Sequence, residues 1–72
     1  MKYYYYVAII TKSDNVFYTH GIVKTVLNDF PLLETENTLS KNNSITPKDI
    51  VITFYKEITE ENYKSYNNER YH

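Results

Sequence analysis

Cysteine and tryptophan are absent from this chain of 72 residues, which contains one glycine and two prolines. Without cysteine, neither disulfides nor thiolate zinc sites can stabilise the fold. A single glycine also excludes phosphate-binding loops and dinucleotide fingerprints, which need several glycines at fixed spacing. The length allows one domain near the lower size limit for a stable core. We therefore expect a single domain over residues 1–72, stabilised by packing or by self-association.

A strong net charge is also missing, since eight basic and nine acidic residues leave a formal charge of −1. Such a chain has no field that attracts nucleic acid over its whole surface. No apolar run is long enough to span a membrane, and the N-terminal run is too short and too aromatic for a signal peptide. We expect a cytoplasmic protein that makes no membrane contact.

The longest apolar and aromatic run is Lys2–Thr11, with the sequence KYYYYVAIIT. Aromatic and β-branched residues favour a strand, in which side chains alternate between two faces. One face carries Tyr3, Tyr5, Val7 and Ile9, and the other carries Tyr4, Tyr6, Ala8 and Ile10. Because neither face is polar, this strand is expected to be central, and each face is either covered or reserved for a partner.

The polar cluster Lys12–Asn15 predicts a hairpin loop of four or five residues, followed by an antiparallel strand over Val16–Val26. In that strand, one face carries Phe17, Thr19, Gly21, Val23 and Thr25, and the other carries Val16, Tyr18, His20, Ile22 and Lys24. Gly21 inside a strand predicts a β-bulge, with a bend or a close approach by another group as the alternatives.

A helix is predicted from about Leu32, with Pro31 in its first turn and Asn28 or Asp29 as its cap. Helical spacing places Leu32, Leu33, Glu36 and Leu39 on one face. A third strand is expected over Asp49–Ile58. Its predicted faces are Ile50, Ile52, Phe54 and Ile58 (interrupted by Lys56) on one side, and Val51, Thr53, Tyr55 and Glu57 on the other.

The last element predicted is a helix that begins near Glu60, with Thr59 as its N-cap, and that frays around Asn67 and Asn68. Glu60 and Lys64 form an i, i+4 pair of favourable orientation. The fold class is therefore α+β, a small three-stranded, mainly antiparallel sheet with two short helices in the order β-β-α-β-α. We expect both helices on one face, which leaves the other face open.

Catalytic and metal-binding patterns are missing from the sequence. His20 and His72 have no neighbouring nucleophile or acid in the sequence pattern, and helix capping explains the paired acids Glu60 and Glu61. No histidines and acids fall in a register that suits metal ligation. We expect no catalytic residues, no metal and no cofactor, and thus a protein that is not an enzyme.

Nine tyrosines are too many for a small core to hide, and tyrosine is enriched in interface cores. The favoured hypothesis is a protein-binding module and homodimer. Its predicted contact surface is the tyrosine-bearing sheet face, made of Tyr4, Tyr6, Tyr18 and Tyr55. The alternative is a single-stranded nucleic-acid binder that stacks bases on tyrosines, which is less favoured because few lysines accompany them. A third hypothesis is a structural domain with no partner.

Asn, Lys, Ile and Tyr, whose codons are AT-rich, dominate the composition. Four features are then notable: the aromatic opening strand after Met1 and Lys2, the hairpin through Ser13–Asn15, the acidic helix from Leu32, and DIVITFYKEI followed by Thr59–Glu61. This layout resembles small uncharacterised proteins encoded by phages and prophages of AT-rich Gram-positive bacteria. The resemblance implies an accessory protein that binds a host or phage macromolecule, for example as an inhibitor of a host protein.

Overall fold

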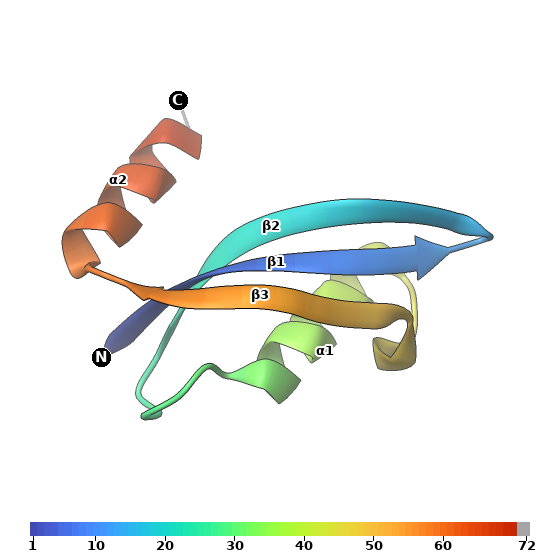
Figure 1. Cartoon of the computed structure of the whole chain (residues 1–72), viewed down its shortest axis with the longest axis horizontal. Helices are drawn as coiled ribbons and strands as arrows, with labels where there is room; N and C mark the ends of the chain where they lie inside the picture. The colour runs from blue at the N-terminus through green and yellow to red at the C-terminus, as the bar shows by residue number, and fades with distance from the viewer. Residues whose placement is uncertain (71–72) are drawn as a thin grey trace.

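The computed structural model describes the backbone of residues 1–70 and the side chains of residues 1–67. Its elements are β1 (Lys2–Lys12), β2 (Asn15–Thr25), α1 (Leu32–Asn43), the 3₁₀ turn η1 (Pro47–Asp49), β3 (Ile50–Ile58) and α2 (Glu60–Arg70). The strand order is β2-β1-β3 and both pairs are antiparallel (Figure 1). The predicted α+β class, the element order and the central position of the first strand are confirmed.

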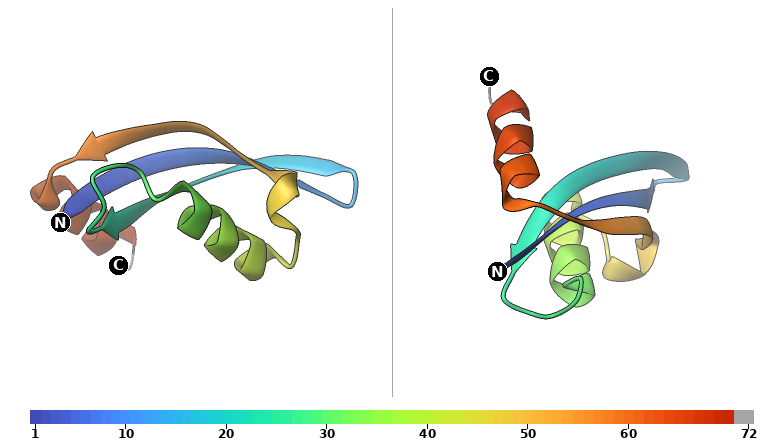
Figure 2. Two further views of the ribbon diagram at one scale, coloured as in Figure 1. Left: turned by 90° about the horizontal axis from the view of Figure 1, so that it is seen from below. Right: turned by 60° about the vertical axis from the view of Figure 1, so that its left-hand side comes forward.

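Helix α1 covers one face of the sheet, and the core lies between them (Figure 2). The core residues come from β1, β3, α1 and the segment before α1: Tyr4, Tyr6, Ala8, Ile10, Phe30, Leu39 and Ile50. All four β1 members are even-numbered, as the period-two alternation of a strand requires. The structure thus assigns the Tyr4 face of β1 to the core and leaves the Tyr3 face on the opposite side.

The hairpin between β1 and β2 is tighter than the sequence predicted. Only Ser13 and Asp14 lie outside the strands, and both have positive φ angles of 51° and 67°. Two successive left-handed residues make the turn whose twist matches a two-residue hairpin. The register then runs unbroken from the Lys12 pair with Asn15 to the Lys2 pair with Thr25.

The unbroken register shows that Gly21 does not form the predicted bulge. Gly21 pairs directly with Tyr6, and a Cβ atom built on Gly21 would lie 2.7 Å from the Tyr6 hydroxyl oxygen. Of the alternatives predicted for Gly21, the close approach of another group is therefore the correct one, and that group is the Tyr6 ring. The glycine leaves room for the Tyr6 ring to lie across β2.

The bulge lies instead in β3. Val7 pairs with Phe54 and Ala8 with Ile52, so that Thr53 is an extra residue on the β3 side. Its hydroxyl donates a hydrogen bond of 3.2 Å to the Val7 carbonyl. An extra residue reverses the facing of every side chain beyond it. The predicted faces of the third strand were therefore wrong: Ile50, Ile52, Tyr55 and Glu57 share the core face, and Val51, Phe54, Lys56 and Ile58 share the other.

The predicted face of α1 is confirmed at Leu39 but wrong at Leu32 and Leu33. Thr35 and Leu39 are the buried residues of α1, while Leu33 is 74% exposed and Leu32 is half exposed. Thr35 can be buried because its hydroxyl donates a 2.8 Å hydrogen bond to the Pro31 carbonyl. Neither predicted cap holds α1, since Pro31 occupies its N-cap position.

Helix α2 begins as predicted but packs on the face opposite to α1. Thr59 caps it by accepting a hydrogen bond of 3.1 Å from the Asn62 amide, and Glu60 pairs with Lys64 at 3.6 Å. The helix continues to Arg70 instead of fraying at Asn67 and Asn68. Its Tyr63 and Tyr66 rings contact the odd-numbered tyrosines of β1. The expectation that both helices share one face was thus wrong. His72, considered above as a catalytic candidate, lies outside the described residues.

Candidate functional site

The structure does not bring the four predicted contact tyrosines together on one exposed face. Tyr4 and Tyr6 are 4% and 8% exposed, and both rings pack against Phe30. Tyr55 stacks on Phe30 with 4.5 Å between ring centroids and lies on this same face. Tyr18, which is 72% exposed, lies on the opposite face beside Ile9. Three of the four thus surround Phe30 in or beside the core, and only Tyr18 faces outward on the uncovered side.

The uncovered part of the opposite face is the strongest candidate surface, and we call it the open half-face. It consists of Val7, Ile9, Val16, Tyr18, Val51 and Phe54. The register joins these residues directly, because Ile9 pairs with Tyr18 on one side and with Val51 on the other. The four residues from the outer strands are each between 49% and 72% exposed. Together they form an apolar surface without a charged side chain, bordered on the same face by Thr11 and His20, which pair with Val16 and Val7.

The other end of this face is occupied by α2. The Tyr63 ring lies 4.9 Å from the Tyr3 ring, and the Tyr66 hydroxyl lies 2.8 Å from Nδ1 of His20. The Tyr3 hydroxyl donates a hydrogen bond of 3.3 Å to Glu60. Partial burial beneath α2, and then the Glu60 carboxylate, raise the pKa of the Tyr3 hydroxyl above its ordinary value of 10.0. The hydroxyl therefore stays protonated at neutral pH and remains a donor that ties α2 to β1.

The charged strand residues of this face lie at the same end as α2. Lys24 pairs with Tyr3 across the β1–β2 ladder, and Lys56 pairs with Tyr5 across the β1–β3 ladder. No Asp or Glu of the three strands shares their face, since Glu57 lies on the core face, where it pairs with Lys2 at 3.8 Å. The face is thus divided into an end under α2, which carries Lys24, Lys56 and the Glu60 carboxylate, and the neutral open half-face.

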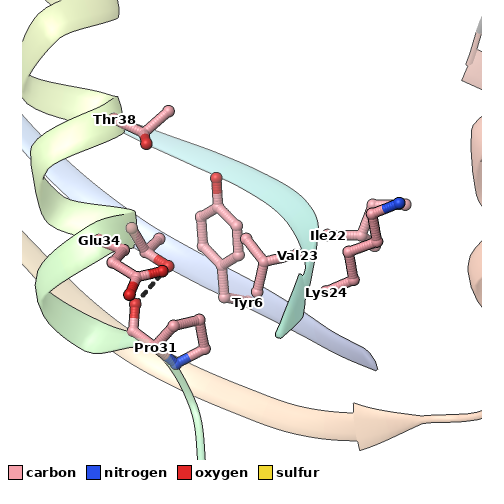
Figure 3. A pocket seen from close by; sticks show the side chains of 8 residues that line it. Tyr6, Ile22, Val23, Lys24, Pro31, Glu34 and Thr38 are labelled. Atoms are coloured by element: carbon pink, nitrogen blue, oxygen red, sulfur yellow. Dashed lines mark hydrogen bonds between the residues drawn. The ribbon is translucent and has the colours of Figure 1, made fainter. Parts of the chain in front are cut away.

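A groove of about 290 Å³ lies between α1 and β2. Figure 3 shows the Tyr6 ring between the two elements, with Glu34 and Thr38 on the helix side. Lys24 also lines the groove but lies on the far side of β2 from Tyr6. Glu34 and Lys24 are thus the charged side chains among the described residues that line the groove, and no ion pair joins them.

A second, more polar recess of about 400 Å³ lies beside the middle of β2. It is lined by Thr19–Ile22, by Asn42 and Asn43 at the end of α1, and by Tyr63, Tyr66 and Asn67 of α2. His20 is its one imidazole, and its Nδ1 is already engaged with Tyr66. Within the described side chains, no group of three His, Cys, Asp or Glu residues lies close enough to hold a metal ion. Neither recess offers the paired groups that acid–base or metal chemistry needs.

Sequence reasoning missed most of the open half-face for two reasons. The alternation of β1 correctly placed Val7 and Ile9 on one face. The contact surface was predicted on the opposite face of β1 because Tyr4 and Tyr6 lie there. Phe54 was assigned to the same face as Ile50 because the bulge at Thr53 leaves no glycine or proline as a signal. The pairing of Val51 and Phe54 with the odd-numbered face appears only once the register is known.

A smaller apolar surface lies at the corner between β2 and α1. Its exposed residues are Val26, Leu27, Leu32 and Leu33. A shallow depression of about 260 Å³ lies there, beside Phe30 and Pro31. This corner surface is separate from the open half-face, because α1 lies on the opposite side of the sheet.

Comparison with known proteins finds no family model, no curated protein and no solved structure that matches the chain. Among the described residues, neither helix is long and apolar enough to cross a membrane.

Proposed function

We propose that this protein is a small, non-catalytic protein-binding module that makes its contacts through the open half-face. The observation that carries the proposal is the set of neighbouring apolar side chains left uncovered on one side of a three-stranded sheet. Contiguous apolar surface of this kind marks interaction sites in small soluble proteins. The cores of protein interfaces are likewise depleted of charge and enriched in aromatic residues.

Tyr18 and Phe54 are the expected anchors of this contact. They lie on the two outer strands, on either side of Val7 and Ile9. Large aromatic side chains that become fully desolvated supply a disproportionate share of binding energy. Because their surroundings are β-branched and packed in a sheet, the anchors are held in place before a partner arrives.

The setting of this binding is part of the proposal. The resemblance to phage and prophage proteins supports a cytoplasmic accessory protein whose partner is a bacterial protein. The absence of an acid–base pair in either recess supports a role without catalysis. Inhibition of a host protein by occupying its surface fits both points.

The proposal predicts that Tyr18→Lys removes protein binding while the fold remains. Tyr18 is 72% exposed, so its replacement is expected to change the free energy of unfolding by less than about 1 kcal/mol. The measurement compares the bacterial proteins retained by immobilised wild type and by the variant. We expect at least tenfold less retention, which corresponds to about 1.4 kcal/mol.

The matched control is Leu33→Lys, which adds the same charge at an equally exposed site on α1. This control is expected to retain the same proteins as wild type. Retention that is unchanged in Tyr18→Lys and in Phe54→Lys would contradict the proposal.

Single-stranded nucleic-acid binding is the second candidate, and one observation favours it. Lys24 and Lys56 share a face with Tyr18 and Phe54, and no strand carboxylate lies on that face. Phosphate contacts from lysine combined with base stacking on aromatic rings are the usual means of binding single strands. This candidate predicts quenching of tyrosine fluorescence by an oligothymidylate at low salt, lost on added salt and in Lys24→Ala. Absence of quenching at low salt removes it.

A further inference from the structure

We infer that the occupant of the open half-face is a second copy of this chain, packed face to face. The inference rests on the proposed function, because a second copy would use the same surface and another protein would have to displace it. It describes a two-fold dimer in which two sheets form the centre and the two α1 helices form the outer layers. Each copy buries its Tyr18 and Phe54 between the sheets, which lie about 10 Å apart in such packing.

Charge favours a second copy, and the size of the surface sets the strength of the contact. An isologous contact places a surface against itself, so a charge near its axis would meet a like charge. The open half-face has none, whereas the far end of the same face carries Lys24 and Lys56. The molecule measures 37 × 30 × 18 Å, so its broad sides are the two sides of the sheet. Because α2 covers one end of this side, the open half-face matches a small interface, below about 600 Å² from each partner, as in weak and concentration-dependent dimers.

Pairing through the sheet edges is the competing way to join two copies, and each edge is obstructed over part of its length. The edge of β3 is interrupted by the extra residue Thr53, and a bulge disrupts the ladder that a new strand would need. The edge of β2 is flanked at Thr19–Ile22 by the end of α1 and by α2, which line the polar recess there. The uncovered face remains as the accessible route.

The position of α2 determines how the two copies are oriented. Helix α2 contacts Tyr3 and Tyr5 and stands over that end of the face (Figure 2). Two copies with parallel strands would bring both α2 helices to the same end, where they collide. A two-fold axis across the strands at Ile9 places the α2 helices at opposite ends. Strand β2 then faces β2 of the second copy, and β3 faces β3.

This orientation makes a specific prediction for cross-linking, and the chain has no cysteine to interfere. Tyr18 and Val51 both pair with Ile9, so both lie at the level of the axis. We expect the single variants Tyr18→Cys and Val51→Cys each to form covalent dimers with a short bifunctional thiol reagent. Leu33→Cys, which is equally exposed but lies on α1, is expected to yield at least tenfold less dimer at the same concentration.

A mixture of the two cysteine variants tests the orientation itself. If the strands were parallel, β2 would face β3, and Tyr18→Cys would link to Val51→Cys in preference to itself. Preferential mixed dimers, or equal yields from Leu33→Cys and the two sheet variants, would overturn the proposed packing. Val51→Cys keeps both aromatic anchors, so it reports on the interface even if replacement of Tyr18 weakens it.

Failure of this inference can be told apart from failure of the proposed function. If no sheet variant forms dimers but Tyr18→Lys still loses the retained proteins, the second copy is overturned and the binding surface stands. If dimers form as expected but retention is unchanged in Tyr18→Lys, self-association stands and binding of another protein through this face is overturned.

Discussion

Replacement of Phe30 by alanine is expected to lower the free energy of unfolding by about 3–5 kcal/mol. Phe30 is 7% exposed, and its ring meets three tyrosines: it stacks on Tyr55 and packs against Tyr4 and Tyr6 at centroid distances of 5.6 and 6.1 Å. A cavity at this point removes the contact between the sheet and the segment that leads into α1. For a domain of this length, roughly 4–11 kcal/mol is the total stability to be expected, so the loss is a large part of it.

Urea denaturation at a fixed protein concentration measures this loss, because self-association would otherwise alter the midpoint. Leu33→Ala is the control, since Leu33 is mostly exposed three residues away in the sequence. We expect that control to stay within about 0.5 kcal/mol of wild type. A Phe30→Ala variant as stable as Leu33→Ala would show that the aromatic cluster is not the centre of the core.

Gly21→Val is expected to destabilise the fold by about 1–3 kcal/mol, although valine is a better strand former than glycine. Gly21 has no positive φ, so backbone strain does not enter. The cost arises because a Cβ atom would lie 2.7 Å from the Tyr6 hydroxyl oxygen and 3.0 Å from the ring carbon that carries it. The buried Tyr6 ring would have to move against α1.

A double-mutant cycle separates this clash from other effects of the substitution. In a Tyr6→Leu background the shorter side chain leaves Gly21 open, so Gly21→Val is expected to cost less there by at least about 1 kcal/mol. The free energies of all four proteins come from chemical denaturation. Equal costs of Gly21→Val in both backgrounds would mean that close approach of Tyr6 is not the reason for glycine at this position.

The strand pattern of the first half of the chain was predictable because β1 and β2 obey the period of two without interruption. Eleven consecutive pairs, from Lys2 with Thr25 to Lys12 with Asn15, keep each predicted face intact. The same reasoning failed in β3, where one extra residue at Thr53 moved Phe54 to the uncovered face. Hydrophobicity alone cannot locate such a bulge, because Thr53 is an ordinary strand residue by composition.

The predictions of how the helices pack failed for a different physical reason. Leu32 and Leu33 are as apolar as the buried Leu39, yet Thr35 is buried in their place, because a hydrogen bond to the Pro31 carbonyl satisfies its hydroxyl. Local hydrogen bonding of this kind is invisible to a hydrophobic pattern. The side on which α2 packs was equally unpredictable, since its tyrosines suit either face of β1.

The candidate site changed as a result of these corrections. Of the four tyrosines chosen from the sequence, Tyr4 and Tyr6 are core residues and Tyr55 stacks on Phe30 beside the core. Only Tyr18 remains on the surface that we propose for binding. Its neighbours Val7, Ile9, Val51 and Phe54 are less conspicuous in the sequence. They share a surface only because the register of three strands brings them together.

The central claim is that the open half-face is the interface between two copies of the chain, and light scattering across a concentration series tests it most directly. The wild-type mass is expected to rise from 8.6 kDa toward twice that value, while Tyr18→Lys stays at 8.6 kDa and Leu33→Lys follows the wild type. A wild type and a Tyr18→Lys variant with the same mass at every concentration would contradict the account.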